Sequence, residues 1–365
     1  MNPELLKQFD DFVNNLKGKT VGILFDSDAD GMCSGVITAH AVERLGGDMK
    51  WCTTQTERGG AMGYDIIQKM HEEPVEILIT CDKPIDQNPE RVKEAEAMSK
   101  ILCLDHHVVN NDIQSEKTLF IKAQLLIDLE GGSQYPTAKL AYDLFGRVID
   151  VSQWDWIAAA GLIADASYRS WRDFVDGQLK KMNEPIPKDI FKSKIAKVSK
   201  LINNVLIFDS TLSNEIFKEL KNAKSIDEFT SSNLTQYEQV VQDEMEYWLN
   251  NYKTAEFNED LDLIWYEIKP KFRIGSPVST ILSMNTFPNK SVIVVQDLGK
   301  DNFSMSFRRQ DRKVNMAELA RSCTEGLEKA NGGGHVPAAG GSVLKKDMPV
   351  FKERVLKYLR EHKTS

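Results

Sequence analysis

Apolar residues in the first half of the chain recur in two patterns. In Pro3–Leu16 and Gly35–Leu45 they stand three or four positions apart, which predicts amphipathic helices. Three short apolar runs have the length of buried strands, and they are Thr20–Phe25, Val75–Thr80 and Lys100–Leu104. Because short apolar strands alternate with helices, the pattern predicts an α/β fold built on a parallel sheet.

The pattern changes twice further along the chain. From about residue 171 to about residue 258 the sequence is polar, with helical stretches, which favours a helical connector. Apolar runs return at 261–268, 291–297 and 303–309, and a charged amphipathic segment, Pro349–His362, ends the chain. They predict a second, smaller α/β unit. We therefore expect a first domain over 1–185, a helical connector over 186–258 and a second domain over 259–365.

Composition narrows the class of protein. Of the 365 residues, 41% are hydrophobic and 27% are charged, which is ordinary for a soluble protein. No run approaches the roughly 18 apolar residues that cross a bilayer, and the N-terminus lacks the apolar core of a secretory signal. The five scattered cysteines form no C-x-x-C pair, which favours buried free thiols. We expect a cytoplasmic protein without a membrane partner.

The formal net charge of −8 bears on nucleic-acid binding. Proteins that coat long DNA usually present a basic face. The acidic balance therefore argues against a large electrostatic footprint, but it leaves room for a local basic cleft that holds a short oligonucleotide.

Three aspartates alternate directly after the first predicted strand: Asp26, Asp28 and Asp30. The segment DSDADG resembles the start of an EF-hand calcium loop, but position 12 of such a loop is Ile37 here instead of glutamate. Its flanks are also a strand and a helix instead of two helices. Three carboxylates this close repel one another unless a positive charge compensates them.

Further acids and two histidines follow the next two predicted strands. Asp82 comes after the second strand, and Asp105, His106 and His107 come after the third. In an open parallel sheet, ligands bind beyond the carboxyl ends of the strands, so these groups are expected to meet. Imidazole mixed with carboxylates suits Mn²⁺, Fe²⁺ or Zn²⁺ better than Ca²⁺. Several bridging carboxylates favour a two-metal site with ions roughly 3.5–4 Å apart.

A glycine-rich segment near the C-terminus is a candidate for phosphate binding. Gly332, Gly333 and Gly334 precede His335, and we interpret them as a flexible turn whose bare amides are able to hold an anion. Arg308, in a predicted strand, carries the guanidinium fork that grips phosphate. Taken alone, the glycine run is a weak signal and is more typical of a plain loop.

Four segments, DSDADG, TCDKP, LDHH and GLIADAS, resemble the four motifs of the DHH phosphoesterase superfamily, in the same order. The segments FSMSFRR and GGGHVPAAGGS are similar to the DHH-associated domain of RecJ-type exonucleases and short-oligonucleotide phosphodiesterases. The resemblance implies a parallel-sheet DHH domain, a connector and a smaller α/β DHH-associated domain, with the active site in the cleft between domains. One departure is Pro84, which stands where the family's second motif has glycine, so we expect an altered loop beside Asp82.

The resemblance also implies roles for single residues. Two Mn²⁺ ions, with Mg²⁺ or Co²⁺ as substitutes, are the implied cofactors. The implied metal ligands are Asp28, Asp30, Asp82, His106 and Asp165, with Asp26 either a further ligand or a neighbour of the ligands. His107 is implied to contact the scissile phosphate or to assist the leaving group, and Asp105 is implied to orient the histidines. The implied substrate contacts are Arg308, Gly333, Gly334, His335 and Asn331.

These features predict a metal-dependent phosphodiesterase or exonuclease that hydrolyses single-stranded or short oligonucleotides to mononucleotides through a two-metal-activated water. Its partners are single-stranded DNA or RNA, with a replication or repair protein as a further candidate. One alternative is a cyclic or linear dinucleotide phosphodiesterase. Another is a Cdc45-like replication scaffold with little or no catalysis, although every ligand position is filled here. The GGGH segment counts against a pyrophosphate or polyphosphate hydrolase.

Overall fold

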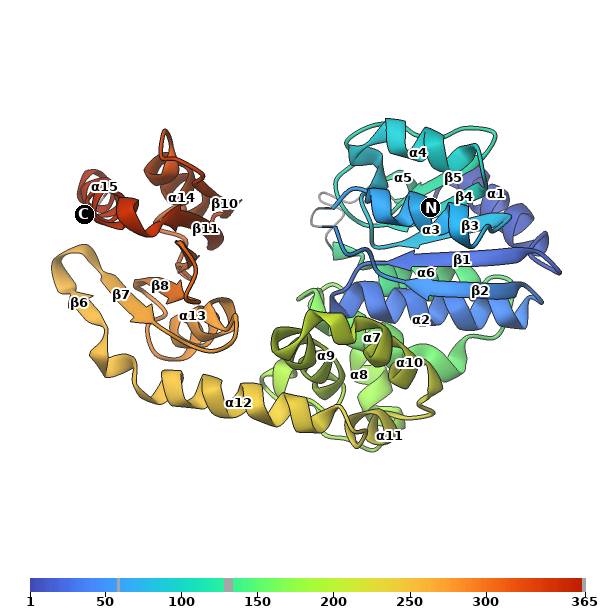
Figure 1. Ribbon diagram of the computed structural model, residues 1–365. Coiled ribbons are helices and arrows are strands. Elements are labelled where there is room, and N and C mark those ends of the chain that lie inside the picture. Colours follow the sequence, from blue (N-terminus) through green and yellow to red (C-terminus); the bar gives the residue numbers. More distant parts are fainter. Residues whose placement is uncertain (58–59, 128–133, 363–365) are drawn as a thin grey trace. The chain divides into compact units, whose positions relative to one another are not determined.

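The computed structural model describes residues 1–57, 60–127 and 134–362 (Figure 1). Contacts divide the chain into two compact units, Met1–Gln236 and Tyr237–Ser365. Within the described residues, no helix has both the length and the apolar character that crossing a bilayer requires. All five cysteines are free thiols, and four of them are buried.

The first unit is built on a five-stranded sheet in the order β2-β1-β3-β4-β5. Every neighbouring pair in this sheet is parallel, which confirms the predicted α/β class. The strands are β1 (Thr20–Phe25), β2 (Asp48–Thr53), β3 (Ile77–Cys81), β4 (Lys100–Asp105) and β5 (Thr118–Lys122). The sequence pattern missed β2 and β5. Strand β2 lies at the sheet edge and is mostly not buried, so it carries no continuous apolar run.

Helices cover both faces of this sheet (Figure 1). Helices α3 (Tyr64–Glu72) and α4 (Pro89–Glu96) pack on one face, over a core that includes Leu78, Ile101 and Phe120. The other face carries α2 (Ala29–Arg44), α6 (Thr137–Phe145) and α7 (Asp155–Ala164), which contact one another. Helix α1 (Pro3–Asn14) contacts β5, and short α5 (Ala123–Leu126) follows that strand.

Several helices from the segment that we expected to be a connector pack onto the first unit. After α8 (Arg172–Lys181) come α9 (Ala196–Phe208), α10 (Ser213–Asn222) and α11 (Ile226–Thr230). Helix α9 contacts α7, and α10 contacts α2. Residues 196–230 therefore extend the helical layer on one face of the first sheet.

The second unit has a six-stranded sheet in the order β10-β11-β9-β8-β7-β6. Only the pair β7–β8 is parallel, and the other pairs are antiparallel. The strands are β6 (Glu256–Asn258), β7 (Leu263–Ile268), β8 (Ser291–Asp297), β9 (Asn302–Arg308), β10 (Asn331–His335) and β11 (Ala338–Leu344). The three apolar runs expected in this unit correspond to β7, β8 and β9.

The second sheet also has helices on both faces. Helices α14 (Met316–Thr324) and α15 (Met348–Glu361) cover a core that contains Trp265, Ile293 and Phe307. Helix α13 (Gly275–Asn285) contacts β8 and β9, and α12 (Thr235–Asn250) begins at the boundary between the units.

The prediction of a flexible turn at Gly332–His335 is wrong. These residues belong to strand β10, which pairs with β11 as an antiparallel hairpin. A Cβ at Gly332 would lie 2.2 Å from the Ala320 carbonyl oxygen of α14, so the strand approaches that helix more closely than any side chain permits. The glycine there serves close packing of backbone, a role that composition alone does not separate from turn formation.

Candidate metal centre

The strand order makes β1 and β3 neighbours, although β2 lies between them in the sequence. In a doubly wound sheet, ligands bind beyond the carboxyl ends of the strands, where the strand order reverses. Asp26 follows β1 and Asp82 follows β3, while Asp105 is the last residue of the adjacent β4. The acids that the sequence places at three strand ends therefore lie at one edge of the sheet.

The acidic turn after β1 runs directly into α2. Asp28 precedes the helix, and its carboxylate accepts a hydrogen bond from the Gly31 amide at 2.9 Å, which caps the helix. A Cβ at Gly31 would lie 2.3 Å from the Asp26 carbonyl oxygen, so this turn requires glycine. Asp30 then falls in the first turn of α2 and is 1% exposed. The motif DSDADG is therefore a strand-to-helix turn that carries three carboxylates.

The start of α6 holds two of these acids in place. The Asp30 carboxylate accepts hydrogen bonds from the Thr137 and Ala138 amides at 2.7 and 3.0 Å. The Thr137 hydroxyl donates to Asp82 Oδ1 at 2.9 Å. Amides at a helix N-terminus favour a negative charge. Thr137 was not predicted from the sequence, where its only local signal is Pro136 followed by threonine at a helix start.

Asp82 occupies an unusual backbone conformation. Its φ is 61°, in the left-handed region that residues other than glycine rarely adopt, and its side chain is buried. Such strain persists where the surrounding structure holds it, often at functional sites. The next residue, Lys83, is also buried, and its Nζ lies 3.3 Å from Asp26 Oδ1. Pro84 then precedes a short 3₁₀ turn, Ile85–Gln87.

One nitrogen of His106 faces several carboxylates. Its Nε2 lies 3.3 Å from Asp82 Oδ1, 3.4 Å from Asp165 Oδ2 and 3.9 Å from Asp30 Oδ2. Asp165 directly follows the last residue of α7. A Cβ at Gly161 would lie 2.8 Å from Asp30 Oδ1, so the glycine of GLIADAS lets α7 approach the acidic edge. Three acids, one from α2 and one each from directly after β3 and α7, therefore converge on the imidazole that follows β4.

His107 is held by Asp105. The Asp105 Oδ1 atom lies 2.7 Å from His107 Nδ1 and accepts the backbone amides of His106 and His107 at 2.8 and 3.2 Å. Burial by itself raises the pKa of Asp105, but the hydrogen bond from His107 and the Lys122 ammonium outweigh burial and lower it to about 2. Asp105 is therefore a charged acceptor that sets the position of the His107 ring.

The cluster carries more negative charge than its own cations balance. Burial is the main cause that raises the pKa of the carboxyl groups in this cluster, and the pKa of Asp30 reaches about 7. In most of these groups, repulsion from neighbouring aspartates raises the pKa further. The carboxyls affected are Asp28, Asp30, Asp82 and Asp165. A bound cation removes this repulsion and keeps the groups ionised.

The donor atoms form three overlapping sets with ligand atoms within 4.8 Å of one another. The sets are Asp26–Asp28–Asp82, Asp30–His106–Asp165 and Asp82–His106–His107. Asp82 and His106 each belong to two sets, so they link the others. Oxygen donors with imidazole nitrogen are a ligand set for Mn²⁺ and related divalent ions. The residues present therefore fit a divalent metal site, with Asp26 inside the cluster.

The predicted substrate contacts lie in the second unit, on strands β9 and β10. Arg308 of β9 and His335 of β10 both pair with Ala338 of β11. The Arg308 guanidinium donates to the Ser276 and Thr280 hydroxyls of α13 at 2.8 and 3.0 Å, and burial lowers its pKa. Gly334 and Gly333 follow along β10, and Asn331 stands at the far end of that strand. Ser276 and Thr280 belong to no recognisable motif, so the sequence did not predict them.

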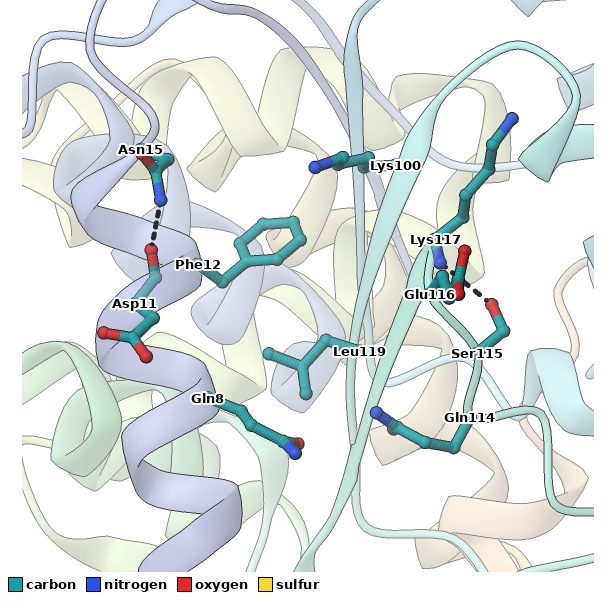
Figure 2. Close-up of a pocket in the computed structure, with 10 residues that line it drawn as sticks. All are labelled: Gln8, Asp11, Phe12, Asn15, Lys100, Gln114, Ser115, Glu116, Lys117 and Leu119. Atoms are coloured by element: carbon teal, nitrogen blue, oxygen red, sulfur yellow. Dashed lines mark hydrogen bonds between the residues drawn. The ribbon is translucent and has the colours of Figure 1, made fainter.

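A surface pocket of about 330 Å³ lies on the first unit away from the acidic cluster (Figure 2). Phe12 and Asp11 of α1 line it, together with Lys100 and Leu119. Lys100 is the first residue of β4, so the pocket lies at the amino ends of the strands. The residues that line the pocket carry charges of both signs, and none of them is histidine. This pocket therefore lacks the set of carboxylates and histidines that is found at the opposite edge of the sheet.

Comparisons with known proteins bear on the family and on the fold. Residues 20–164 match the model of the DHH family, N-terminal domain. RecJ from Thermus thermophilus in complex with Mn²⁺ superposes with a TM-score of 0.71 at 18% identity, covering 98% of this chain and 55% of that one. A second structure, an exonuclease RecJ bound to manganese, gives 0.64 at 18% identity, with coverage of 97% and 94%. CDC45 from Entamoeba histolytica gives 0.55 at 9% identity, with 99% of both chains covered.

The sheet order, the acidic edge and the matched residues define a phosphoesterase fold of the DHH type. Residues 20–164 carry the N-terminal domain of the DHH family, and the fold of the chain is RecJ-like. It spans about half the length of the Thermus RecJ chain. None of the curated protein sequences compared with it matches. At these identities the structural likenesses establish the fold, and activity has to be argued from the site.

Proposed function

We propose that this protein is a metal-dependent phosphodiesterase that releases mononucleotides from single-stranded or short oligonucleotides. One observation carries the proposal: Asp82 and His106 link three sets of potential metal ligands at the switch point of a DHH-type sheet. The two RecJ structures were determined with manganese, which favours Mn²⁺ as the ion, and Mg²⁺ or Co²⁺ would substitute. The cytoplasmic location stays a prediction.

The residues that would hold the ions are Asp26, Asp28, Asp30, Asp82, His106 and Asp165. When bound, divalent ions supply an activated water and polarise a phosphoryl oxygen. The protein contributes the arrangement: Thr137 steadies Asp82, and the α6 amides steady Asp30. These contacts hold the carboxylates before substrate arrives, so little reorganisation opposes the reaction.

His107 supplies the chain's own contact with the reacting phosphate in this proposal. Nδ1 of His107 is hydrogen-bonded to Asp105, so Nε2 is the ring nitrogen that remains for a phosphoryl or leaving-group oxygen. The His107 side chain is 43% exposed, whereas that of His106 is 7% exposed. The difference in exposure supports a division of roles, with His106 as a metal ligand and His107 as the residue that meets substrate.

The second unit is proposed to be a DHH-associated domain, over residues 259–365, that binds the nucleotide end. Arg308 presents a guanidinium that Ser276 and Thr280 orient, and such a fork suits phosphate. His335 stands beside it across β11. A domain that holds a chain end would make cleavage proceed from that end, as in an exonuclease. A dinucleotide phosphodiesterase would use the same contacts with a shorter substrate.

A scaffold of the Cdc45 kind is the second candidate, because CDC45 covers 99% of this chain. Its TM-score of 0.55 is below the 0.64 and 0.71 of the RecJ structures. This chain also has an acid or a histidine at every ligand position that the DHH resemblance implies. Both points favour the enzyme.

The test is an assay of the full chain with Mn²⁺ on end-labelled RNA and DNA oligomers of graded length. We expect mononucleotide release from short single strands. Asp82→Asn is the inactive variant, and Asp11→Asn is the matched control, because Asp11 lines the pocket of Figure 2. Mn²⁺ binding without hydrolysis of any oligomer would favour the scaffold. If Asp11→Asn lost activity and Asp82→Asn kept it, the chemistry would lie at the amino ends of the strands, and the proposed site would be refuted.

A further inference from the structure

A buried lysine stands behind the histidine pair. Lys122 is the last residue of β5, and the parallel register sets it beside Asp105, the last residue of β4. Its Nζ lies 3.0 Å from Asp105 Oδ2 and 2.8 Å from Asp86 Oδ1, and it donates to the Val108 carbonyl at 2.9 Å. The side chains of Lys122, Asp105 and Asp86 are fully buried.

This lysine is one ion pair away from His107. Its ammonium is bound to one carboxylate oxygen of Asp105, and the other oxygen is bound to His107 Nδ1. A carboxylate held on both sides has little freedom to rotate. The chain of contacts Asp86–Lys122–Asp105–His107 therefore connects the interior of the sheet to the exposed imidazole.

Asp86 holds the loop that follows the histidines. Its Oδ2 accepts the Asn110 amide at 2.6 Å and the Asn111 amide at 3.3 Å. The Asn111 side chain donates back to the Asp86 carbonyl at 2.7 Å. Together with the bond from Lys122 to Val108, these contacts fix the backbone that follows His107.

A buried ion pair is weak evidence for stability, because removing the charges from water offsets most of their attraction. Apolar residues would fill the same space at lower cost. What such a network provides is a single defined position for the groups that it holds. Here the group at its exposed end is His107.

We propose that Lys122, supported by Asp86, is a positioning residue for His107. The ammonium fixes the Asp105 carboxylate, which fixes the imidazole ring and leaves Nε2 in one place. The proposal rests on the proposed function, in which His107 meets the phosphate. It predicts that loss of Lys122 acts on turnover through His107, and leaves metal and substrate binding in place.

The first test is a double-mutant cycle on the full chain with Mn²⁺. Lys122→Met is expected to lower kcat by about 10- to 100-fold, the range seen when outer partners of active-site groups are removed, with KM changed less than about threefold. In a His107→Ala background the same substitution should lower kcat less than about threefold further, because a residue that acts through His107 has nothing left to position. If the loss of kcat in the double variant equals the product of the losses in Lys122→Met and His107→Ala, the proposal is overturned.

Because Lys122→Met leaves two buried carboxylates, a charge-balanced variant accompanies it. Asp86→Asn with Lys122→Met removes one negative and one positive charge together, and it is expected to show the same loss of kcat. Lys139→Met is the matched control, since Lys139 is another buried lysine of this unit and pairs with Asp143. The fold-loss of kcat in Lys139→Met, whatever its size, should multiply with the fold-loss in His107→Ala when the two substitutions are combined.

The second test does not depend on hydrolysis. In ¹⁵N-histidine-labelled protein with Mg²⁺, the Nδ1–H signal of His107, assigned with His107→Ala, should be sharp in wild type. It should broaden or vanish in the Lys122 variants, while Mn²⁺ affinity measured by calorimetry changes little. An unchanged ring signal, or a large loss of Mn²⁺ affinity, would overturn the positioning role. An inactive wild type with a ring signal that responds to Lys122 would refute the proposed function alone.

Discussion

The acidic edge of the first unit and the glycine-rich end of the second are built on opposite principles. At the acidic edge, side chains are proposed to hold the metal ions, and buried carboxylates such as Asp30 and Asp82 repel one another. At the glycine-rich end, the absence of side chains matters, because it lets β10 lie against α14. Charged side chains indicate their role in a sequence, whereas glycine does not show whether it serves a turn, a ligand or close packing.

The largest expected effect tests the acidic edge. Asp82→Asn removes a charge that two of the three ligand sets share. We expect kcat to fall by about 10³-fold or more, since the ions position and activate the reactants. Calorimetry should show weakened Mn²⁺ binding in the same variant. Full activity in Asp82→Asn would mean that the shared carboxylate is not part of the centre.

The glycine-rich end gives a matched pair of variants. Gly332→Ala puts a Cβ 2.2 Å from the Ala320 carbonyl oxygen, whereas a Cβ at Gly333 meets nothing within 4 Å. We expect Gly332→Ala to lower the free energy of unfolding by about 1–3 kcal/mol, as overpacking does. Gly333→Ala should leave it nearly unchanged, as followed by urea denaturation. Equal effects would show that close packing on α14 is not what glycine provides.

The Gly333→Ala variant also separates packing from binding. If Gly333 contacts substrate as proposed, KM should rise while stability holds. A KM equal to that of wild type would confine the role of the glycine run to packing.

Arg308→Lys sharpens the comparison from the binding side. Lysine keeps the positive charge but loses the fork that Ser276 and Thr280 orient. We expect KM for oligonucleotides to rise about tenfold, with kcat changed much less, which is the reverse of the pattern for Asp82→Asn. Steady-state kinetics on a short single strand decides the point. An effect on kcat alone would argue that Arg308 acts in the chemical step.

The smallest expected effect concerns pH. Burial and the charge of Asp165 raise the pKa of Asp30 from 3.8 to about 7 in the folded, metal-free protein. A group with a raised folded pKa favours folding below its unfolded pKa, and this contribution is lost as pH rises through the folded value. In EDTA, Tm should therefore fall by a few degrees between about pH 5 and pH 8. Mn²⁺ should raise Tm more at the higher pH than at the lower, and the opposite order would contradict the electrostatic account.

Much of the first unit was predictable because its elements have strong local signals. Strands β1, β3 and β4 are continuous apolar runs, and the acids that follow them stand out by charge. Strand β2 was missed because an edge strand needs no apolar run, and Thr137 because a single hydroxyl carries no pattern. The fully buried Lys122 ends a strand that the pattern also missed, so its link to Asp105 could not be predicted before the register was known.

By itself, the sequence determined which chemical groups the protein has and that they follow strands in a fixed order, because local apolar periodicity specifies each element. The tertiary structure alone decided which strands are neighbours. The order β2-β1-β3-β4-β5 sets Asp26 beside Asp82 and Lys122 beside Asp105, and it results from long-range packing of helices on both sheet faces. Only that packing turns separate acids into one centre, and turns a run of glycines into a strand.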